Sequence, residues 1–188
     1  MSTLKNLFET LQQQGYETDK GSVHSYIDVY EILLEPYRNT AKAMLEIGVF
    51  KGNSLRMWNE YFSCPVYGID CDITPHGGMA DLTEMIDSGQ FNISIFDASN
   101  EALVKQHFEG KLFDVIIEDA NHQLEQQVQL YHIWKKYLTT DGIYIIEDVE
   151  DIDKSRSTFE NIDPEKTVIV MDRRHLKNRF DDVLIIIK

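Results

Sequence analysis

The chain has few of the features that mark secreted or membrane-spanning proteins. Its 188 residues include only two cysteines, Cys64 and Cys71, which are too few for a disulfide framework and are not spaced as metal ligands. No run of about 18 apolar residues is present, so no transmembrane helix is expected. Residues 1–15 lack the apolar core of a signal peptide. We therefore expect a cytoplasmic protein whose two cysteines are reduced and buried.

Positive charge is also scarce. Lys and Arg together number 18 against 32 for Asp and Glu, which gives a formal net charge of −14. Binding to a phosphate backbone depends on Lys and Arg that displace counterions, so nucleic acid is not an expected partner. The length fits one domain over residues 1–188, and the hydrophobic share of 43% is ordinary for a globular protein.

What the chain does contain is a regular alternation of short apolar runs and helical stretches. This alternation predicts βαβ units and a doubly wound α/β fold with a mostly parallel, seven-stranded, Rossmann-like sheet. The last two apolar runs have no long helix between them, so one of them is expected to form an antiparallel edge strand. The predicted strands are 43–47, 66–69, 91–95, 113–117, 143–146, 167–170 and 183–187. The predicted helices are 53–62, 79–87, 99–107 and 122–138, preceded by a helix that stops at Gly15 and one that runs from Ser25 to near Pro36.

A glycine turn follows the first predicted strand. Gly48 and Gly52 follow Glu46 in the pattern E-x-G-x-x-x-G, and glycines let a ligand approach the backbone closely. Asp70 ends the second predicted strand, where a carboxylate accepts the ribose hydroxyls in nucleoside-binding folds. The pattern lacks the middle glycine of the dinucleotide motif G-x-G-x-x-G. A purely structural turn remains the alternative interpretation.

Asp97 and Ala98 follow the third predicted strand. In a nucleoside site, this position lies near the amino group of the adenine. An equally good interpretation is that Asp97 caps the next helix.

Three acids follow the fourth and fifth predicted strands, with a histidine beside them. They are Asp119, Glu147 and Asp148, and the histidine is His122. The carboxyl ends of parallel strands meet at one edge of the sheet, and carboxylates packed together disfavour ionisation unless a cation joins them. Oxygen ligands favour Mg²⁺. The alternative is that Asp119 caps the following helix while the other two acids are solvated.

Together these segments resemble a known family. The stretches LEIGVFKG, YGID, DANH and YIIEDV resemble class I S-adenosylmethionine-dependent methyltransferases, in particular the metal-dependent sugar O-methyltransferases of the mycinamicin and tylosin type. The segment TDKGSVHSYIDVYE at 18–31 and the C-terminal RFDDVLIIIK extend the resemblance over most of the chain. One departure is that Ala120 and Asn121 stand where the family's D-G-D-H motif has its middle pair, which leaves the acceptor open.

The resemblance implies a role for each candidate residue. The glycine turn with Glu46 would hold the methionine half of the cofactor, Asp70 its ribose, and Asp97 with Ala98 its adenine. Residues 1–40 would form a helical lid that closes over the cofactor or substrate. His122 would be the general base, and Mg²⁺ would be held by Asp119, Glu147 and Asp148. The full set implied in cofactor binding is Lys20, His24, Tyr26, Glu46, Gly48, Gly52, Asp70, Asp97, Ala98 and Asp119.

The expected activity is methyl transfer from S-adenosylmethionine to a sugar hydroxyl of a glycan, such as a polysaccharide, or of a glycosylated metabolite. Three alternatives stay open: a methyltransferase of catechol-like or other small-molecule diols, a nicotinamide-dependent oxidoreductase, and a non-catalytic binding domain. The sequence also leaves open whether the chain forms a homo-oligomer.

Overall fold

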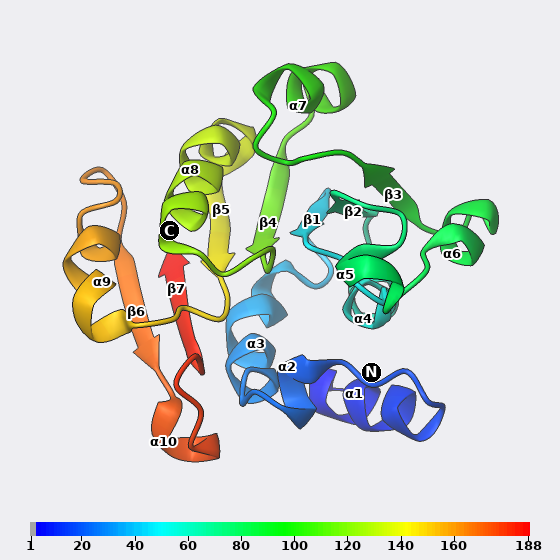
Figure 1. Cartoon of the computed structure of the whole chain (residues 1–188), viewed down its shortest axis with the longest axis horizontal. Helices are drawn as coiled ribbons and strands as arrows, with labels where there is room; N and C mark the ends of the chain where they lie inside the picture. The colour runs from blue at the N-terminus through cyan, green and yellow to red at the C-terminus, as the bar shows by residue number, and fades with distance from the viewer. Residues whose placement is uncertain (1–2) are drawn as a thin grey trace.

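A seven-stranded sheet lies at the centre of the computed structural model, which describes residues 3–188 (Figure 1). The strand order is β3-β2-β1-β4-β5-β7-β6. The first five strands in this order are parallel, and β7 runs antiparallel to both β5 and β6. The predicted doubly wound sheet with an antiparallel edge is therefore confirmed. The strands are β1 (Met44–Ile47), β2 (Val66–Asp70), β3 (Asn92–Ile95), β4 (Phe113–Glu118), β5 (Leu138–Ile146), β6 (Val168–Asp172) and β7 (Val183–Ile187).

Helices cover both faces of the sheet. Successive side chains of a strand point to opposite faces, so Met44 and Leu45 of β1 belong to two different apolar cores. One core is closed by α7 (Glu101–Phe108), α8 (Leu124–Trp134) and α9 (Ile152–Glu160), and the other by α1 (Leu4–Gln13), α3 (Ile27–Leu34) and α4 (Asn53–Tyr61). The shorter helices are α2 (Asp19–Ser22), α5 (Pro75–Gly78), α6 (Thr83–Asp87), α10 (Arg174–Lys177) and the 3-10 turns η1 (Glu35–Tyr37) and η2 (Lys135–Tyr137).

The helix boundaries depart from the sequence-based expectations at functionally important points. The helix expected from residue 122 begins only at Leu124, because His122 has a left-handed backbone with a φ of +60°. The helix expected over 79–87 is replaced by α5 and α6, with a break between them. The later start of α8 places His122 in the loop between β4 and α8 rather than on a helix.

Three helices were not predicted: α2, α9 and α10. In α9, the buried residues Ile152, Ser155 and Phe159 recur at spacings of three and four, but one of them is a serine, so the apolar pattern is weak. The mostly polar segment 16–24, for which no helix was expected, contains α2. Packing against the rest of the chain, rather than local propensity, explains a four-residue helix of this kind.

The expectation of buried cysteines is wrong. Cys71 is exposed at the end of β2 and Cys64 is half-buried, and both are free thiols. No helix within residues 3–188 has the length and apolar character needed to cross a bilayer.

Candidate active site

The carboxyl ends of the parallel strands meet at one edge of the sheet. β1 ends at Ile47, β2 at Asp70, β4 at Glu118 and β5 at Ile146, and ligands bind at this edge in open α/β sheets. Figure 1 shows the N-terminal helices, in blue, beside the arrowheads of β4 and β5. The residues singled out in the sequence lie in this region.

The turn after β1 depends on Gly48. Its φ is +95°, and a Cβ built there would lie 1.9 Å from the carbonyl oxygen of Asp119. Gly48 therefore lets the turn lie directly against the end of β4. Gly52, at the N-cap of α4, is also left-handed, but a Cβ there would meet the flexible side chain of Met85. The glycine turn is thus needed by the fold, and it brings the β1 loop to Asp119.

Asp70 holds the same turn from the end of β2. Its Oδ2 accepts hydrogen bonds from the backbone N–H groups of Val49 and Phe50, both at 2.9 Å, and Oδ1 accepts from the N–H of Asp72 at 3.3 Å. The side chain is 9% exposed. Oδ2 of Asp70 is thus occupied by two hydrogen bonds from the loop, and Oδ1, with one longer hydrogen bond, is the more available acceptor.

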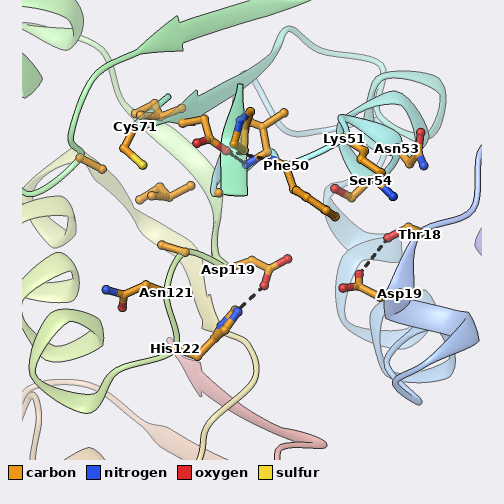
Figure 2. Close-up of a pocket in the computed structure, with 18 of the residues that line it drawn as sticks. Thr18, Asp19, Phe50, Lys51, Asn53, Ser54, Cys71, Asp119, Asn121 and His122 are labelled. Carbon is orange, nitrogen blue, oxygen red and sulfur yellow. Dashed lines mark hydrogen bonds and ion pairs between the residues drawn. The ribbon is translucent and has the colours of Figure 1, made fainter. Parts of the chain in front are cut away.

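A cavity of about 650 Å³ opens above these turns (Figure 2). Gly48, Asp70, Asp97 and Ala98 line it from the first three strand ends. From the other side it is lined by Thr18, Asp19, Asn53, Asn121 and His122. This volume lies within the range of about 300–1,000 Å³ usual for small-molecule sites.

Asp97 lines the cavity, and it does not cap the following helix, which was its alternative interpretation. Its Oδ1 accepts hydrogen bonds from the N–H and the hydroxyl of Ser99, at 2.9 and 2.7 Å. The helix cap itself is Asn100, which accepts from two N–H groups of α7. Asp97 is exposed, so its second oxygen remains accessible from the cavity side.

Glu46 lies beneath the cavity rather than in its wall. Its two oxygens accept hydrogen bonds from Ser54 and from the indole N–H of Trp58, each at 3.0 Å. The side chain is fully buried, and burial raises the pKa of Glu46 to about 7. Glu46 therefore ties β1 to α4.

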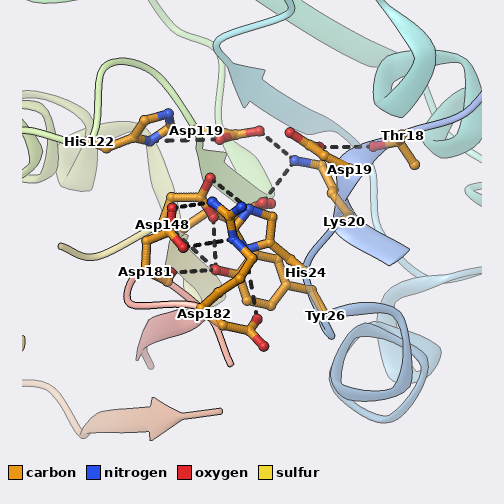
Figure 3. Close-up of polar contacts among 12 residues, drawn as sticks. Thr18, Asp19, Lys20, His24, Tyr26, Asp119, His122, Asp148, Asp181 and Asp182 are labelled. Atoms are coloured by element: carbon orange, nitrogen blue, oxygen red, sulfur yellow. Dashed lines mark hydrogen bonds and ion pairs between the residues drawn. The ribbon is translucent and has the colours of Figure 1, made fainter. Parts of the chain in front are cut away.

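Asp119, Glu147 and Asp148 converge as expected and are called the acid cluster here. Figure 3 shows Asp119 and Asp148 close to Lys20, His24 and Tyr26. The ammonium group of Lys20 lies 2.6 Å from Oδ2 of Asp119 and 2.9 Å from Oε2 of Glu147. Glu46 is 3.6 Å from the same nitrogen. Burial lowers the pKa of Lys20, but these acids outweigh it and hold the pKa well above its usual value. Lys20 is therefore a buried cation of the cluster.

Lys20, His24 and Tyr26, expected to close over the cofactor, are buried residues whose side chains contact acids. Among the described residues, those of the N-terminal segment that line the cavity are Glu17, Thr18, Asp19 and Ser22. His24 and Tyr26 reach Asp148, and Tyr30 reaches Glu147. Sequence reasoning missed Tyr30 and Asp19. Tyr30 fitted the apolar stripe of α3, while Asp19 was a single acid in a polar segment.

His122 lies at the cavity wall beside the acid cluster. Its Nδ1 is 3.9 Å from Oδ1 of Asp119, and this nitrogen is buried without a hydrogen-bond partner among the described residues. Asp148 is left-handed like His122, with a φ of +51°. Such non-glycine conformations are costly and cluster at functional sites. Both residues owe their positions to strained loop backbone at the ends of β4 and β5.

The acid cluster and His122 suit a divalent cation. Asp119, His122 and Asp148 each offer a ligand atom, and these atoms lie within 4.8 Å of one another. Burial, and after it the charge of Asp119, raises the pKa of Asp148 to about 8, and burial likewise raises that of Glu147. The single ammonium group of Lys20 therefore does not neutralise the three carboxylates of the acid cluster. The unpartnered Nδ1 of His122 faces the same place.

Comparison with known proteins finds O-methyltransferases among the curated relatives. No protein-family model matches the chain. A tetracenomycin rhamnosyl 2'-O-methyltransferase from Streptomyces olivaceus is 28% identical over 142 residues, covering 71% of this chain and 35% of the relative. Demethylmacrocin O-methyltransferase from Streptomyces fradiae is 29% identical over 143 residues, covering 71% and 34%. The matched region thus spans about a third of each relative.

Solved structures show the same architecture. The methyltransferase MycE of the mycinamycin pathway, in complex with Mg, S-adenosylhomocysteine and mycinamycin VI, superposes with a TM-score of 0.68 at 18% identity, covering 97% of this chain and 54% of MycE. An O-methyltransferase from Bacillus cereus in complex with S-adenosylhomocysteine gives 0.68 at 13% identity, covering 100% and 90%. The chain has the class I methyltransferase fold. Its resemblance to sugar O-methyltransferases of the mycinamicin and tylosin type is confirmed.

Proposed function

We propose that this chain carries the site of an S-adenosylmethionine-dependent O-methyltransferase that uses Mg²⁺ and acts on a sugar hydroxyl. The observation that carries the proposal is a shared cavity. The glycine turn and Asp70 line one side of it, and Asp119 and His122 line the other. A nucleoside site and a cation site thus open onto one space, as transfer from a nucleoside cofactor to a metal-held acceptor requires. The curated relatives are named as O-methyltransferases.

The cofactor fits the half of the cavity formed by β1, β2 and β3. Gly48 lines this half and has no side chain, so the backbone of the turn would lie against the methionine portion. The freer oxygen of Asp70 is placed to accept from the ribose hydroxyls. Asp97 and Ala98 also line this half and would face the adenine end. Glu17, Thr18, Asp19 and Ser22 line the cavity from the N-terminal segment, so this part of the 1–40 segment would serve as the lid.

Magnesium would be held by Asp119, Glu147 and Asp148. Asp119 and Asp148 each offer an oxygen within 4.8 Å of the other and of a ring nitrogen of His122, and Asp119 and His122 line the cavity. When bound, S-adenosylmethionine supplies an electrophilic methyl group, and Mg²⁺ makes a bound hydroxyl more acidic. Asp119 and Asp148 would orient the acceptor through that ion, since oriented reactants lose less entropy on reaching the transition state.

His122 then removes the acceptor proton. Its Nδ1 is buried beside Asp119, which leaves Nε2 as the ring nitrogen to receive it. Transfer would join the hydroxyl oxygen to the methyl carbon that S-adenosylmethionine supplies, and the electron pair of the broken carbon–sulfur bond would remain on sulfur. An imidazole suits this task near neutral pH. The products are the methyl ether, S-adenosylhomocysteine and the protonated histidine.

A methyl-transfer screen tests the proposal. The purified chain is incubated with S-adenosylmethionine and Mg²⁺, and products are followed by mass spectrometry with glycosylated metabolites, glycans and catechols as acceptors. We expect a gain of one methyl group on a glycoside, loss of transfer with EDTA, and recovery when Mg²⁺ is restored. Transfer only to catechols would mean that the acceptor is a catechol rather than a sugar. Binding of NAD in preference to S-adenosylmethionine would overturn the proposal.

A further inference from the structure

Four residues of the N-terminal segment contact the acid cluster from below the cavity. They are Lys20, His24, Tyr26 and Tyr30, called the anchoring residues here, and each is at most 2% exposed. They come from α2, from α3 and from the residues between these helices. Their partners in the acid cluster lie between 99 and 127 positions further along the chain.

Every member of the acid cluster is held by at least one anchoring residue. Lys20 binds Asp119 and Glu147, as described above. The hydroxyl of Tyr30 donates to Oε1 of Glu147 at 2.5 Å. Glu147 therefore has a donor on each oxygen.

Asp148 is held in the same way. The hydroxyl of Tyr26 lies 2.8 Å from its Oδ1, and Nε2 of His24 lies 3.3 Å from its Oδ2. The rings of His24 and Tyr26 stack with their centroids 4.8 Å apart. Figure 3 shows both rings packed against Asp148.

The two tyrosine hydroxyls are not needed for packing alone. Tyr26 and Tyr30 lie in the apolar core with α1 and α4, where phenylalanine would fill almost the same volume. The ring of Tyr30 packs edge-on against Trp58, with centroids 5.3 Å apart. A buried hydroxyl is costly unless it is hydrogen-bonded, and here each one meets a carboxylate. Donors of this kind orient carboxylates that bind metals, and each carboxylate oxygen keeps a lone pair for a cation.

We infer that the anchoring residues are positioning residues that hold the acid cluster in place for a divalent cation. In this arrangement the anchoring residues serve the metal, whereas Glu17, Thr18, Asp19 and Ser22 face the cofactor cavity. The inference rests on the proposed function, because it needs a cation at the acid cluster.

The test compares metal affinity with cofactor affinity in Tyr26→Phe and Tyr30→Phe. Mn²⁺ substitutes for Mg²⁺ at carboxylate sites, and its binding is followed by electron paramagnetic resonance without cofactor. S-adenosylhomocysteine binding is followed separately by calorimetry. The matched control is Tyr131→Phe. The Tyr131 hydroxyl donates to Asp163 at 2.8 Å and Tyr131 is buried, but it lies outside the acid cluster.

We expect each tyrosine variant to lose about 10–100-fold in Mn²⁺ affinity, while its affinity for S-adenosylhomocysteine stays unchanged. Tyr131→Phe should lose a similar hydrogen bond without changing either affinity. Unchanged Mn²⁺ affinity in both variants would overturn the inference, as would a loss of S-adenosylhomocysteine affinity alone. If the wild-type chain binds no Mn²⁺, it is the metal in the proposed function that fails.

Discussion

The cavity beside β1 and β2 and the acid cluster beside β4 and β5 are built in different ways. The cavity is shaped by backbone: Gly48 removes a side chain where none fits, and Asp70 ties the loop through two N–H groups. The acid cluster consists of the buried side chains of Glu147 and Asp148 and the half-buried side chain of Asp119, each fixed by a donor from the N-terminal segment. Steric fit of the backbone therefore determines the structure of the cavity, whereas charge and hydrogen bonding determine that of the acid cluster. Substitutions in the two regions should separate cofactor binding from metal binding and transfer.

The largest difference between the effect on transfer and the effect on cofactor binding is expected at His122. His122→Ala removes the proposed general base, so kcat should fall by roughly 10²–10⁴-fold, while the affinity for S-adenosylhomocysteine stays the same. The exposed His132 on α8 is the control, and His132→Ala should change neither quantity. Steady-state kinetics and calorimetry provide the two measurements. Normal turnover in His122→Ala would remove the histidine from the mechanism.

A substitution of Gly48 tests whether the close contact between the β1 turn and the Asp119 backbone requires glycine at this position. Gly110→Ala is the matched control, because Gly110 is also left-handed, with a φ of +75°, but has no atom within 4 Å of a built Cβ. The control should lose about 1–2 kcal/mol of unfolding free energy, the cost of a left-handed alanine. Gly48→Ala should lose about 1–3 kcal/mol more, from overpacking against Asp119. Denaturant unfolding measures both, and equal losses would mean that the close contact has no consequence.

Asp70 tests the cofactor side without touching the acid cluster. Asp70→Ala removes the acceptor of two loop N–H groups and of the ribose, so S-adenosylhomocysteine affinity should fall by about 1–3 kcal/mol. Asp70→Asn keeps an oxygen for the loop and should lose less. Mn²⁺ affinity should not change in either variant. A parallel loss of metal affinity would mean that the two regions are not separable.

The smallest effect is expected in cysteine labelling. Cys71 lines the cavity, whereas Cys64 does not. Partial burial raises the pKa of both thiols, and it raises that of Cys64 to about 11. Labelling of both should therefore be slow at neutral pH and faster as the pH rises, because the thiolate is the nucleophile. S-adenosylhomocysteine should slow only the labelling of Cys71, as read by mass spectrometry. Equal protection of Cys64 would indicate a global effect of the ligand.

The strand ends illustrate how far sequence patterns reach. Asp70, Asp119, Glu147 and Asp148 were expected at one edge, and the structure places all four there. That expectation needed only the alternation of strands and helices, because parallel strands present their carboxyl ends together. Glu46 was also expected at the cavity, yet it lies beneath it, because its oxygens are bound by Ser54 and Trp58 of α4.

The sequence by itself determined the sheet, the glycine turn and the acids at the strand ends, since these follow from periodicity and local conformational preference. Only the tertiary structure decided which donor meets which acid. Lys20 is 127 positions from Glu147 and Tyr26 is 122 from Asp148, and no local pattern specifies such a contact. It arises because α2 and α3 pack under the ends of β4 and β5. Burial there makes an unpaired carboxylate costly and therefore favours the donors that hold it.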